Sequence, residues 1–531
     1  MTDPQPRAGG DLRLPGDPEL PEPLATHGHP MTAVARLCGR QLFTYRGDAT
    51  PGSWQAVAPV PDLASAIPSI YNAGLGARGT SYVIRLRPNV FWDTEPPRAV
   101  VAQDVIRGLK RLCTPFHTST ALPYLLSTIR GLAEYRDGHP ESLRTPADLA
   151  EYAAAHEIAG VFALDDETLV VELSHPALDL VDILAMPCVS PAPVEYDAYL
   201  PDSPEVRRNL RSTGPYRPMP GPAGRLVLAH NPAWRAESEP VRGRHLDTIT
   251  ITRDATGTDR PPAFLGLDPY LALNTRGPGP LRSRELRRAV ARAVARSGPS
   301  GTARPAHTIV PPGHDGHQES TVDRPVDFTD AGRADGVELT VAHPDTRRGG
   351  AAARQVALDL AKIGAKVHLR PLAQPAYAVL MTRREHAEAG EWDIAVGSWH
   401  ADWLHANGRA FLLPLCHSGS VTNPGGNGDP RVDELIDEAL AAQDDPTRST
   451  AALREAERRA LADAAIIPVL FRPPPVEVPR DPAVRGLTTL SALGGALDLA
   501  GVWLDLPDTS IGTTKPAAAD PAELESTEAR S

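Results

Sequence analysis

Hydrophobic and polar residues alternate along several short segments in the first half of the chain. Such alternation, in segments rich in β-branched residues, is typical of strands that bury one face. Four strands are therefore predicted, at residues 81–90, 168–174, 225–231 and 247–253.

Helices are predicted between these strands. Residues 102–113 carry apolar side chains at helical spacing. Another helix is predicted to begin at Pro146 and to run to about His156. Thr145 suits its N-cap, proline is favoured at the first helical position, and Asp148 follows at the third.

The second half of the chain shows a regular order of strand, helix, strand, helix and strand. The predicted strands are 337–344, 365–372 and 392–399, and the predicted helices are 352–364 and 375–390. Parallel strands need a crossover connection, which is usually a helix. The order therefore predicts an α/β unit with a parallel sheet.

The remaining segments divide into helices and poorly ordered stretches. Two helices are predicted to open at Asp429-Pro430 and Asp445-Pro446, where aspartate can cap the first turn. Residues 297–336, crowded with Gly, Pro, His and Asp, are predicted to be poorly ordered. The tail at 509–531 is polar and has no aromatic residue, so disorder is predicted there.

Composition narrows the possible partners. The 531-residue chain has 41% hydrophobic and 23% charged residues, as in soluble globular proteins, and a net charge of -12. That charge argues against nucleic acid, which requires a basic surface. We see no signal peptide and no apolar run of membrane-spanning length, so the chain as written is expected to begin in the cytoplasm.

Sequence motifs for catalysis or cofactors are lacking. The "GLGARG" segment at 74–79 matches a dinucleotide-binding pattern but leads into a predicted strand instead of a helix, so we interpret it as a loop. No Walker A loop, G-x-S-x-G or H-E-x-x-H is present. We therefore expect no cofactor and no catalytic residue. The four widely spaced cysteines are expected to be ordinary buried thiols; they are Cys38, Cys113, Cys188 and Cys416.

The candidate site is the segment "GSWHADWLHANG" at 397–408. Asp402 follows the predicted strand 392–399, and ligands gather beyond the carboxyl ends of parallel strands. Trp399 and Trp403 flank this carboxylate and could supply apolar walls or an aromatic face for a cation.

Several roles for this segment stay open on the residues alone. Asp402 could bind a cationic ligand, cap the following helix or pair with a local arginine. His400 and His405 could join Asp402 in a metal site, with Cys416 or His417 as a further ligand. Either histidine could also exchange a proton with Asp402.

The chain resembles the bacterial extracellular solute-binding proteins of family 5, the peptide and nickel receptors of ABC importers. The resemblance runs from about residue 9 to about residue 505. The segments that carry it are "SYVIRLRPNVFWD", "RAVVAQDVIRGLKRL", "STGPYRP", "WDIAVGSWHADW" and "GDPRVDELIDEALAAQDDPTR".

This resemblance implies a fold and a division into domains. The expected fold is a bilobed periplasmic-binding-protein-like α/β fold of type II (cluster C), with two doubly wound lobes, an extra domain and a hinge. The expected domains are lobe I at 10–50, 190–270 and 476–508, the extra domain at 51–189, lobe II at 271–475, and the tail at 509–531.

The resemblance also implies a function. In peptide-binding members, the aspartate at the position of Asp402 bonds the α-ammonium group of the ligand; Trp399 matches the family tryptophan, and Trp403 replaces the usual tyrosine. We therefore expect a monomeric, non-enzymatic receptor for a peptide or other amine-bearing solute. An ABC permease and ATPase would be its partners, outside the cytoplasmic membrane. The alternatives are a cytoplasmic relative acting as an enzyme or sensor in a biosynthetic pathway, and a nickel or metallophore receptor using His400, His405 or His417.

Overall fold

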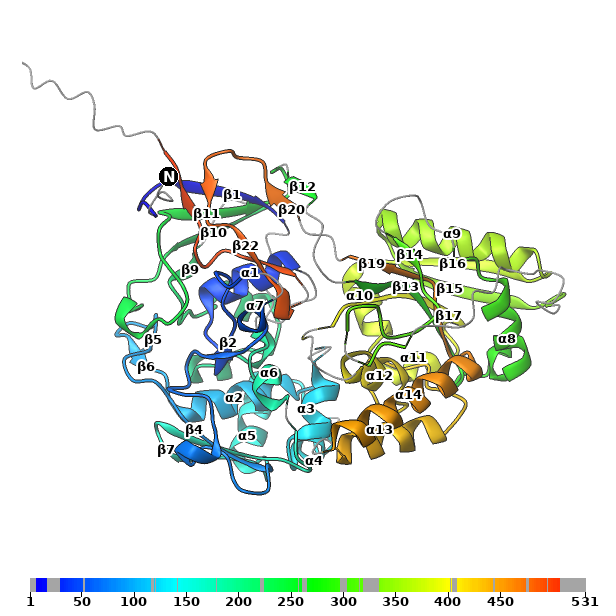
Figure 1. Ribbon diagram of the computed structural model, residues 1–531, viewed down its shortest axis with the longest axis horizontal. Helices are drawn as coiled ribbons and strands as arrows, with labels where there is room; N and C mark the ends of the chain where they lie inside the picture. The colour runs from blue at the N-terminus through cyan, green and yellow to red at the C-terminus, as the bar shows by residue number, and fades with distance from the viewer. Residues whose placement is uncertain are drawn as a thin grey trace, which may run out of the picture.

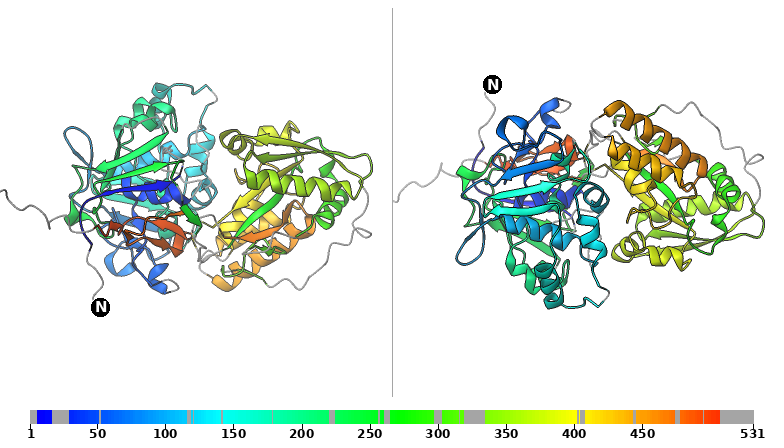
Figure 2. Two further views of the ribbon diagram at one scale, coloured as in Figure 1. Left: turned by 90° about the horizontal axis from the view of Figure 1, so that it is seen from above. Right: turned by 90° about the horizontal axis from the view of Figure 1, so that it is seen from below.

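The fold comprises two lobes that lie side by side (Figures 1 and 2). The computed structural model describes residues 6–506 except 17–28, 51–52, 116–118, 120, 141, 178, 220–223, 256, 260–264, 297–302, 315, 319–333, 402, 404–407, 443–444, 474–476 and 494. The first lobe contains the described residues up to Asp259 and from Glu477 onward, and the second lobe contains those between 265 and 473. The predicted bilobed α/β fold is confirmed.

A four-stranded sheet forms one part of the first lobe. Its order is β1-β11-β10-β9, with β1 parallel to β11 and the other neighbours antiparallel. The strands span Asp11–Pro15 (β1), Tyr216–Met219 (β9), Arg225–His230 (β10) and Thr248–Thr252 (β11). Buried side chains of helix α1 (His29–Cys38) share one apolar core with this sheet.

A smaller antiparallel sheet and several helices form another part of the first lobe. The sheet has the order β4-β8-β7. Its strands are Ser81–Arg85 (β4), Val161–Asp165 (β7) and Thr168–Glu172 (β8), and the helices are Ala102–Leu112 (α2), Leu122–Thr128 (α3), Leu132–Asp137 (α4) and Pro146–Ala155 (α5). The predicted start of α5 is confirmed, because the Thr145 hydroxyl accepts the Asp148 backbone N–H at 3.2 Å.

A seven-stranded sheet forms the centre of the second lobe, in the order β14-β19-β13-β17-β15-β16, with β18 also paired to β13. Strands β16, β15 and β17 run parallel, which confirms the predicted α/β unit. The seven strands are Gly266–Leu273 (β13), Arg304–Pro305 (β14), Glu338–Pro344 (β15), Lys366–Leu372 (β16), Ile394–Trp399 (β17), Ile466–Pro468 (β18) and Leu470–Arg472 (β19).

Helices cover the faces of this sheet, and one prediction among them is wrong. They are Arg284–Ala293 (α8), Arg347–Ala361 (α9), Gln374–Leu380 (α10), Arg384–Glu388 (α11), Arg409–Cys416 (α12), Arg431–Ala441 (α13) and Pro446–Asp463 (α14). The single helix predicted at 375–390 is broken into α10 and α11. The Thr382 hydroxyl bonds the carbonyl oxygen of Ala378 at 2.8 Å, and Arg383 adopts an extended backbone. Such a local side-chain bond competes with helix propagation.

The chain crosses between the lobes twice. It enters the second lobe between β12 (Gly257–Asp259) and β13, and it returns between β19 and β20 (Glu477–Pro479). Strands β12 and β20 pair with each other in the first lobe, and β13 and β19 pair in the second. The boundary expected at 270/271 falls inside β13, so the first crossing lies earlier in the chain than expected.

The prediction of poor order at 297–336 is wrong for part of that segment. Ile309 and Val310 are fully buried, and their backbone N–H groups donate to the Glu457 carboxylate at 2.7 and 3.0 Å. The carboxylate satisfies backbone donors that would otherwise be buried without partners. Residues 297–302, 315, 319–333 and the tail 509–531 lie outside the described residues.

Two further expectations concern cysteines and membrane spans. All four cysteine side chains are buried, as expected for ordinary core thiols. Within the described part of the chain, no helix combines the length and the apolar character needed to cross a bilayer.

Candidate functional site

Trp399 ends strand β17 and points into the core rather than into solvent. Its side chain is 7% exposed, and its indole N–H donates to the carbonyl oxygen of Ala410 at 2.7 Å. Ala410 lies in the first turn of α12. Trp399, near the start of the candidate segment, is therefore hydrogen-bonded to the helix that follows the segment in the same lobe.

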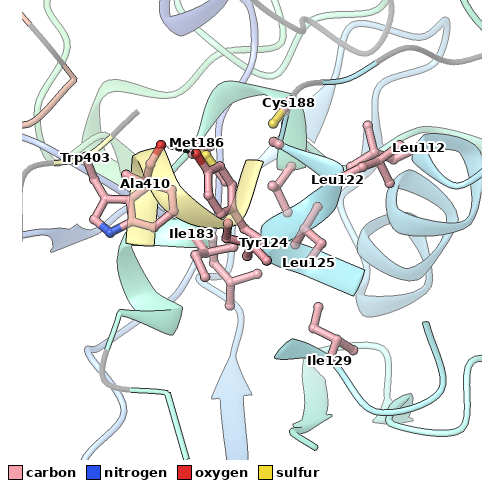
Figure 3. Packing of buried hydrophobic residues seen from close by; sticks show 14 of the residues in the cluster. Leu112, Leu122, Tyr124, Leu125, Ile129, Ile183, Met186, Cys188, Trp403 and Ala410 are labelled. Carbon is pink, nitrogen blue, oxygen red and sulfur yellow. Dashed lines mark hydrogen bonds between the residues drawn. The ribbon is translucent and has the colours of Figure 1, made fainter. Parts of the chain in front are cut away.

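Trp403 lies where the second lobe meets the first. Its side chain is 1% exposed and packs edge-on against Tyr124 of α3, with ring centroids 4.4 Å apart at 77°. Figure 3 shows the Tyr124 hydroxyl pointing at Ala410, whose carbonyl oxygen accepts its hydrogen bond at 2.8 Å. The Trp403 indole N–H is buried and has no acceptor among the described residues. The segment thus forms part of the contact between the lobes.

Asp402 and His405, two of the predicted site residues, lie outside the described residues. The structure does describe the neighbours of Asp402 in the chain, Ala401 and Trp403, and both are buried. The predicted role of Asp402 therefore stays a prediction.

His400, directly after β17, is held as a neutral imidazole. Its pKa is lowered to about 4, chiefly because burial desolvates the ring; the positive charge of Arg348 acts in the same direction, and a hydrogen bond to the backbone of Arg472 opposes the shift in part. The ring lies against Gly266 in β13 so closely that a β-carbon there would overlap it. A base with this pKa is poorly matched to proton transfer near pH 7.

Of the proposed metal ligands at the end of α12, Cys416 is a buried thiol and His417 is paired with a carboxylate. Burial raises the pKa of the Cys416 thiol. Burial alone would lower the pKa of His417, but its 3.3 Å pair with Asp437 and the nearby Asp433 raise it. Within the described ranges, no group of three His, Cys, Asp or Glu side chains is placed to hold a metal ion.

Sequence reasoning missed an ion pair beside the candidate segment. The Arg409 guanidinium, which is fully buried, donates to both carboxylate oxygens of Asp179 in the first lobe, at 2.7 and 2.9 Å. The one available signal was a lone arginine before the apolar run "AFLLPL". Sequence alone could not indicate that its partner lies 230 positions earlier.

A separate cavity of about 290 Å³ lies in the first lobe between α2 and α5. Its cationic side chains are already engaged. Lys110 pairs with Glu157 at 2.9 Å, and Arg107 pairs with Asp197 at 3.2 Å. This cavity shares no residue with the candidate segment.

Comparisons with known proteins agree with this architecture. Residues 58–260 match the family described as bacterial extracellular solute-binding proteins, family 5 Middle. The chain is 24% identical over 453 residues to the periplasmic oligopeptide-binding protein OppA of Salmonella typhimurium, covering 73% of this chain and 76% of that protein.

Solved structures share the fold over nearly the whole chain. The Escherichia coli murein tripeptide binding protein MppA matches with a TM-score of 0.71 at 18% identity, over 94% of this chain and 98% of that one. The clavulanic acid biosynthesis oligopeptide binding protein 2 matches with a TM-score of 0.70 at 22% identity, over 95% and 97%. The Helicobacter pylori protein DppA, solved with the peptide STSA, matches with a TM-score of 0.69 at 19% identity, over 94% and 99%.

Proposed function

We propose that this chain, which carries the middle region of the family 5 bacterial extracellular solute-binding proteins, binds a peptide or similar amine-bearing solute between its lobes for an ABC-type importer. One observation carries the proposal. The segment that contains Asp402 follows the central strand β17, and Trp403 within it meets Tyr124 of the opposite lobe. A solute held there would touch both lobes, and the proposed role is binding without catalysis.

Asp402 is the proposed anchor for the solute's ammonium group. A carboxylate near indole rings attracts a cation strongly, because water is partly excluded. Its neighbours in the chain, Trp399 and Trp403, are 7% and 1% exposed, and these buried indole rings support the proposal.

The test is calorimetry with peptides that differ only at the amino terminus. Thermal-shift screening of a tripeptide library selects one binder, which is then prepared with a free and with an acetylated amino terminus. Asp402→Asn should weaken the free peptide by about 10- to 150-fold, since a hydrogen bond to a charged group contributes about 1.5–3 kcal/mol. Acetylation should weaken wild type similarly but cost little more in Asp402→Asn, because both changes delete one contact.

Asp345→Asn is the matched control. Asp345 is exposed and follows the neighbouring parallel strand β15, so it receives the same substitution at a comparable sheet edge. Its affinity for the free peptide should equal that of wild type. Fully additive losses from acetylation and Asp402→Asn would refute the ammonium anchor. Loss of binding on adding a chelator would instead support the metallophore alternative.

The proposal extends to location and partners. A receptor of this kind works outside the cytoplasmic membrane, in keeping with the extracellular and periplasmic descriptions of the matched family and of OppA. A permease and an ATPase of the ABC type would then take the solute from the closed protein. No nucleic acid is involved in this proposal.

A further inference from the structure

A buried ion pair joins the two lobes next to the candidate site. Arg409 begins α12 in the second lobe, and Asp179 lies in the first lobe at the start of α6 (Leu180–Ile183). Their side chains are 0% and 7% exposed, and two Nη1–oxygen distances of 2.7 and 2.9 Å join them. The pair therefore lies buried in the contact between the two lobes.

The surroundings of Arg409 satisfy most of its guanidinium. Its Nη2 donates to the hydroxyls of Ser127 and Thr128 and to the carbonyl oxygen of Tyr124, all from α3 of the first lobe. Only Nε lacks an acceptor among the described residues. A buried ion pair is favourable when such additional hydrogen bonds offset its desolvation.

Apolar packing reinforces this contact. Trp403 lies edge-on to Tyr124, and the side chains of α3 and α12 belong to one continuous apolar core. Figure 3 shows Trp403 and Ala410 of the second lobe beside Tyr124. A further bridge forms where Arg383 donates to the Pro115 carbonyl. All of these contacts join atoms of one lobe to atoms of the other.

We propose that Arg409 and Asp179 form a clasp that holds the lobes together in the absence of solute. This inference goes beyond the proposed function, because it concerns closure of the protein alone. If the clasp is broken, the lobes can separate and water can solvate the remaining charge. The clasp therefore controls the ratio of closed to open protein, and a solute would bind a protein that already closes.

The experiment measures the distance between the lobes by single-molecule energy transfer without solute. Leu164→Cys on β7 and Leu358→Cys on α9 supply the labels, since both positions are more than 60% exposed and the native cysteines are buried. Unfolding, dialysis and refolding remove any solute carried through purification. Wild type should show a dominant short-distance population. Arg409→Met and Asp179→Asn should each lower the closed-to-open ratio by about tenfold or more.

Controls separate loss of the clasp from general damage. Arg431→Met removes an exposed ion pair with Glu434 in the same lobe and should leave the distance distribution unchanged. The double variant Arg409→Met/Asp179→Asn should open no further than either single variant, since both remove one interaction. Circular dichroism of each variant verifies folding. If a single variant folds poorly because it leaves one buried charge unpaired, the double variant, which carries neither charge, takes its place in the test.

Two results would overturn the clasp: a wild type that is fully open without solute, or an Arg409→Met variant as closed as wild type. Neither depends on which solute binds, so failure of the peptide proposal and failure of the clasp are distinguishable.

Discussion

The first lobe contains a second set of buried arginine–aspartate pairs, which contrasts with the clasp. Arg40 and Arg242 both bind Asp62, each at 2.7 Å, and all three side chains are fully buried. Glu239 accepts from Arg242 at 2.9 Å. This set, which we call the lobe network, joins segments of one lobe, whereas the clasp joins two lobes. The same chemistry therefore stabilises the fold in one place and the closed arrangement in the other.

The difference lies in what happens after a partner is removed. A lone charge inside the lobe network stays buried unless the lobe unfolds, and a buried unpaired charge is strongly destabilising. A lone charge at the clasp reaches water by opening of the lobes. Equal burial therefore predicts unequal effects on folding.

The largest expected effect is on unfolding of the first lobe. Asp62→Asn leaves Arg40 and Arg242 facing a neutral amide and should lower the free energy of unfolding by about 3–5 kcal/mol. Asp179→Asn should lower it by only about 1 kcal/mol, since the open protein solvates the site. Urea denaturation followed by circular dichroism measures both. Equal losses in the two variants would break the distinction between network and clasp.

Lowering the pH should remove part of the stability that the lobe network contributes, and this effect is smaller than that of Asp62→Asn. Burial alone would raise the pKa of Asp62, but Arg242 and Arg40 lower it to about 2. A carboxylate with a lowered folded-state pKa stabilises the protein above its unfolded pKa near 4, and this contribution is lost as pH falls from 4 towards 2. The difference in stability between wild type and Asp62→Asn should shrink by about 2 kcal/mol across that window. A constant difference in urea titrations at pH 5, 4, 3 and 2.5 would contradict the lowered pKa.

The smallest expected effect concerns two tyrosine hydrogen bonds, one between the lobes and one inside the second lobe. Tyr124 donates to Ala410 across the lobes at 2.8 Å, and Tyr377 donates to Val396 within the second lobe at 2.6 Å. Each Tyr→Phe change deletes one hydrogen bond to a carbonyl, a loss of about 1 kcal/mol. Tyr377→Phe should lower the urea midpoint, whereas Tyr124→Phe should instead lower the closed-to-open ratio about fivefold. A reversed pattern would show that the Tyr124 bond supports folding rather than closure.

Short sequence patterns predicted many of the strands and helices, because these elements depend on residues that are neighbours in the chain. The regular order of strands and helices from residue 337 onward predicted strands at 337–344 and 392–399 that β15 and β17 confirm, and the Thr145 cap marks the start of α5. The break between α10 and α11 was missed because no Gly or Pro signals it. Ile309 and Val310 were missed because two apolar residues in a polar segment show no periodicity.

The candidate site was predicted only in part. The position of the candidate segment just after β17 was predicted, because the strand at 392–399 can be recognised from residues that are close together in the sequence. Tyr124 and Asp179 could not be found, because they meet the segment only after two distant parts of the chain pack together. Residues that meet only in the folded protein form no motif of fixed spacing in the sequence.

The paired strands at the two crossings limit how the lobes can move. Strands β12 and β20 are hydrogen-bonded on one side of the crossings, and β13 and β19 on the other. Each lobe therefore keeps the two strands next to the crossings side by side, and loss of the clasp would leave both strand pairs intact. When Arg409 and Asp179 separate, the lobes would stay tethered through two neighbouring points of the chain.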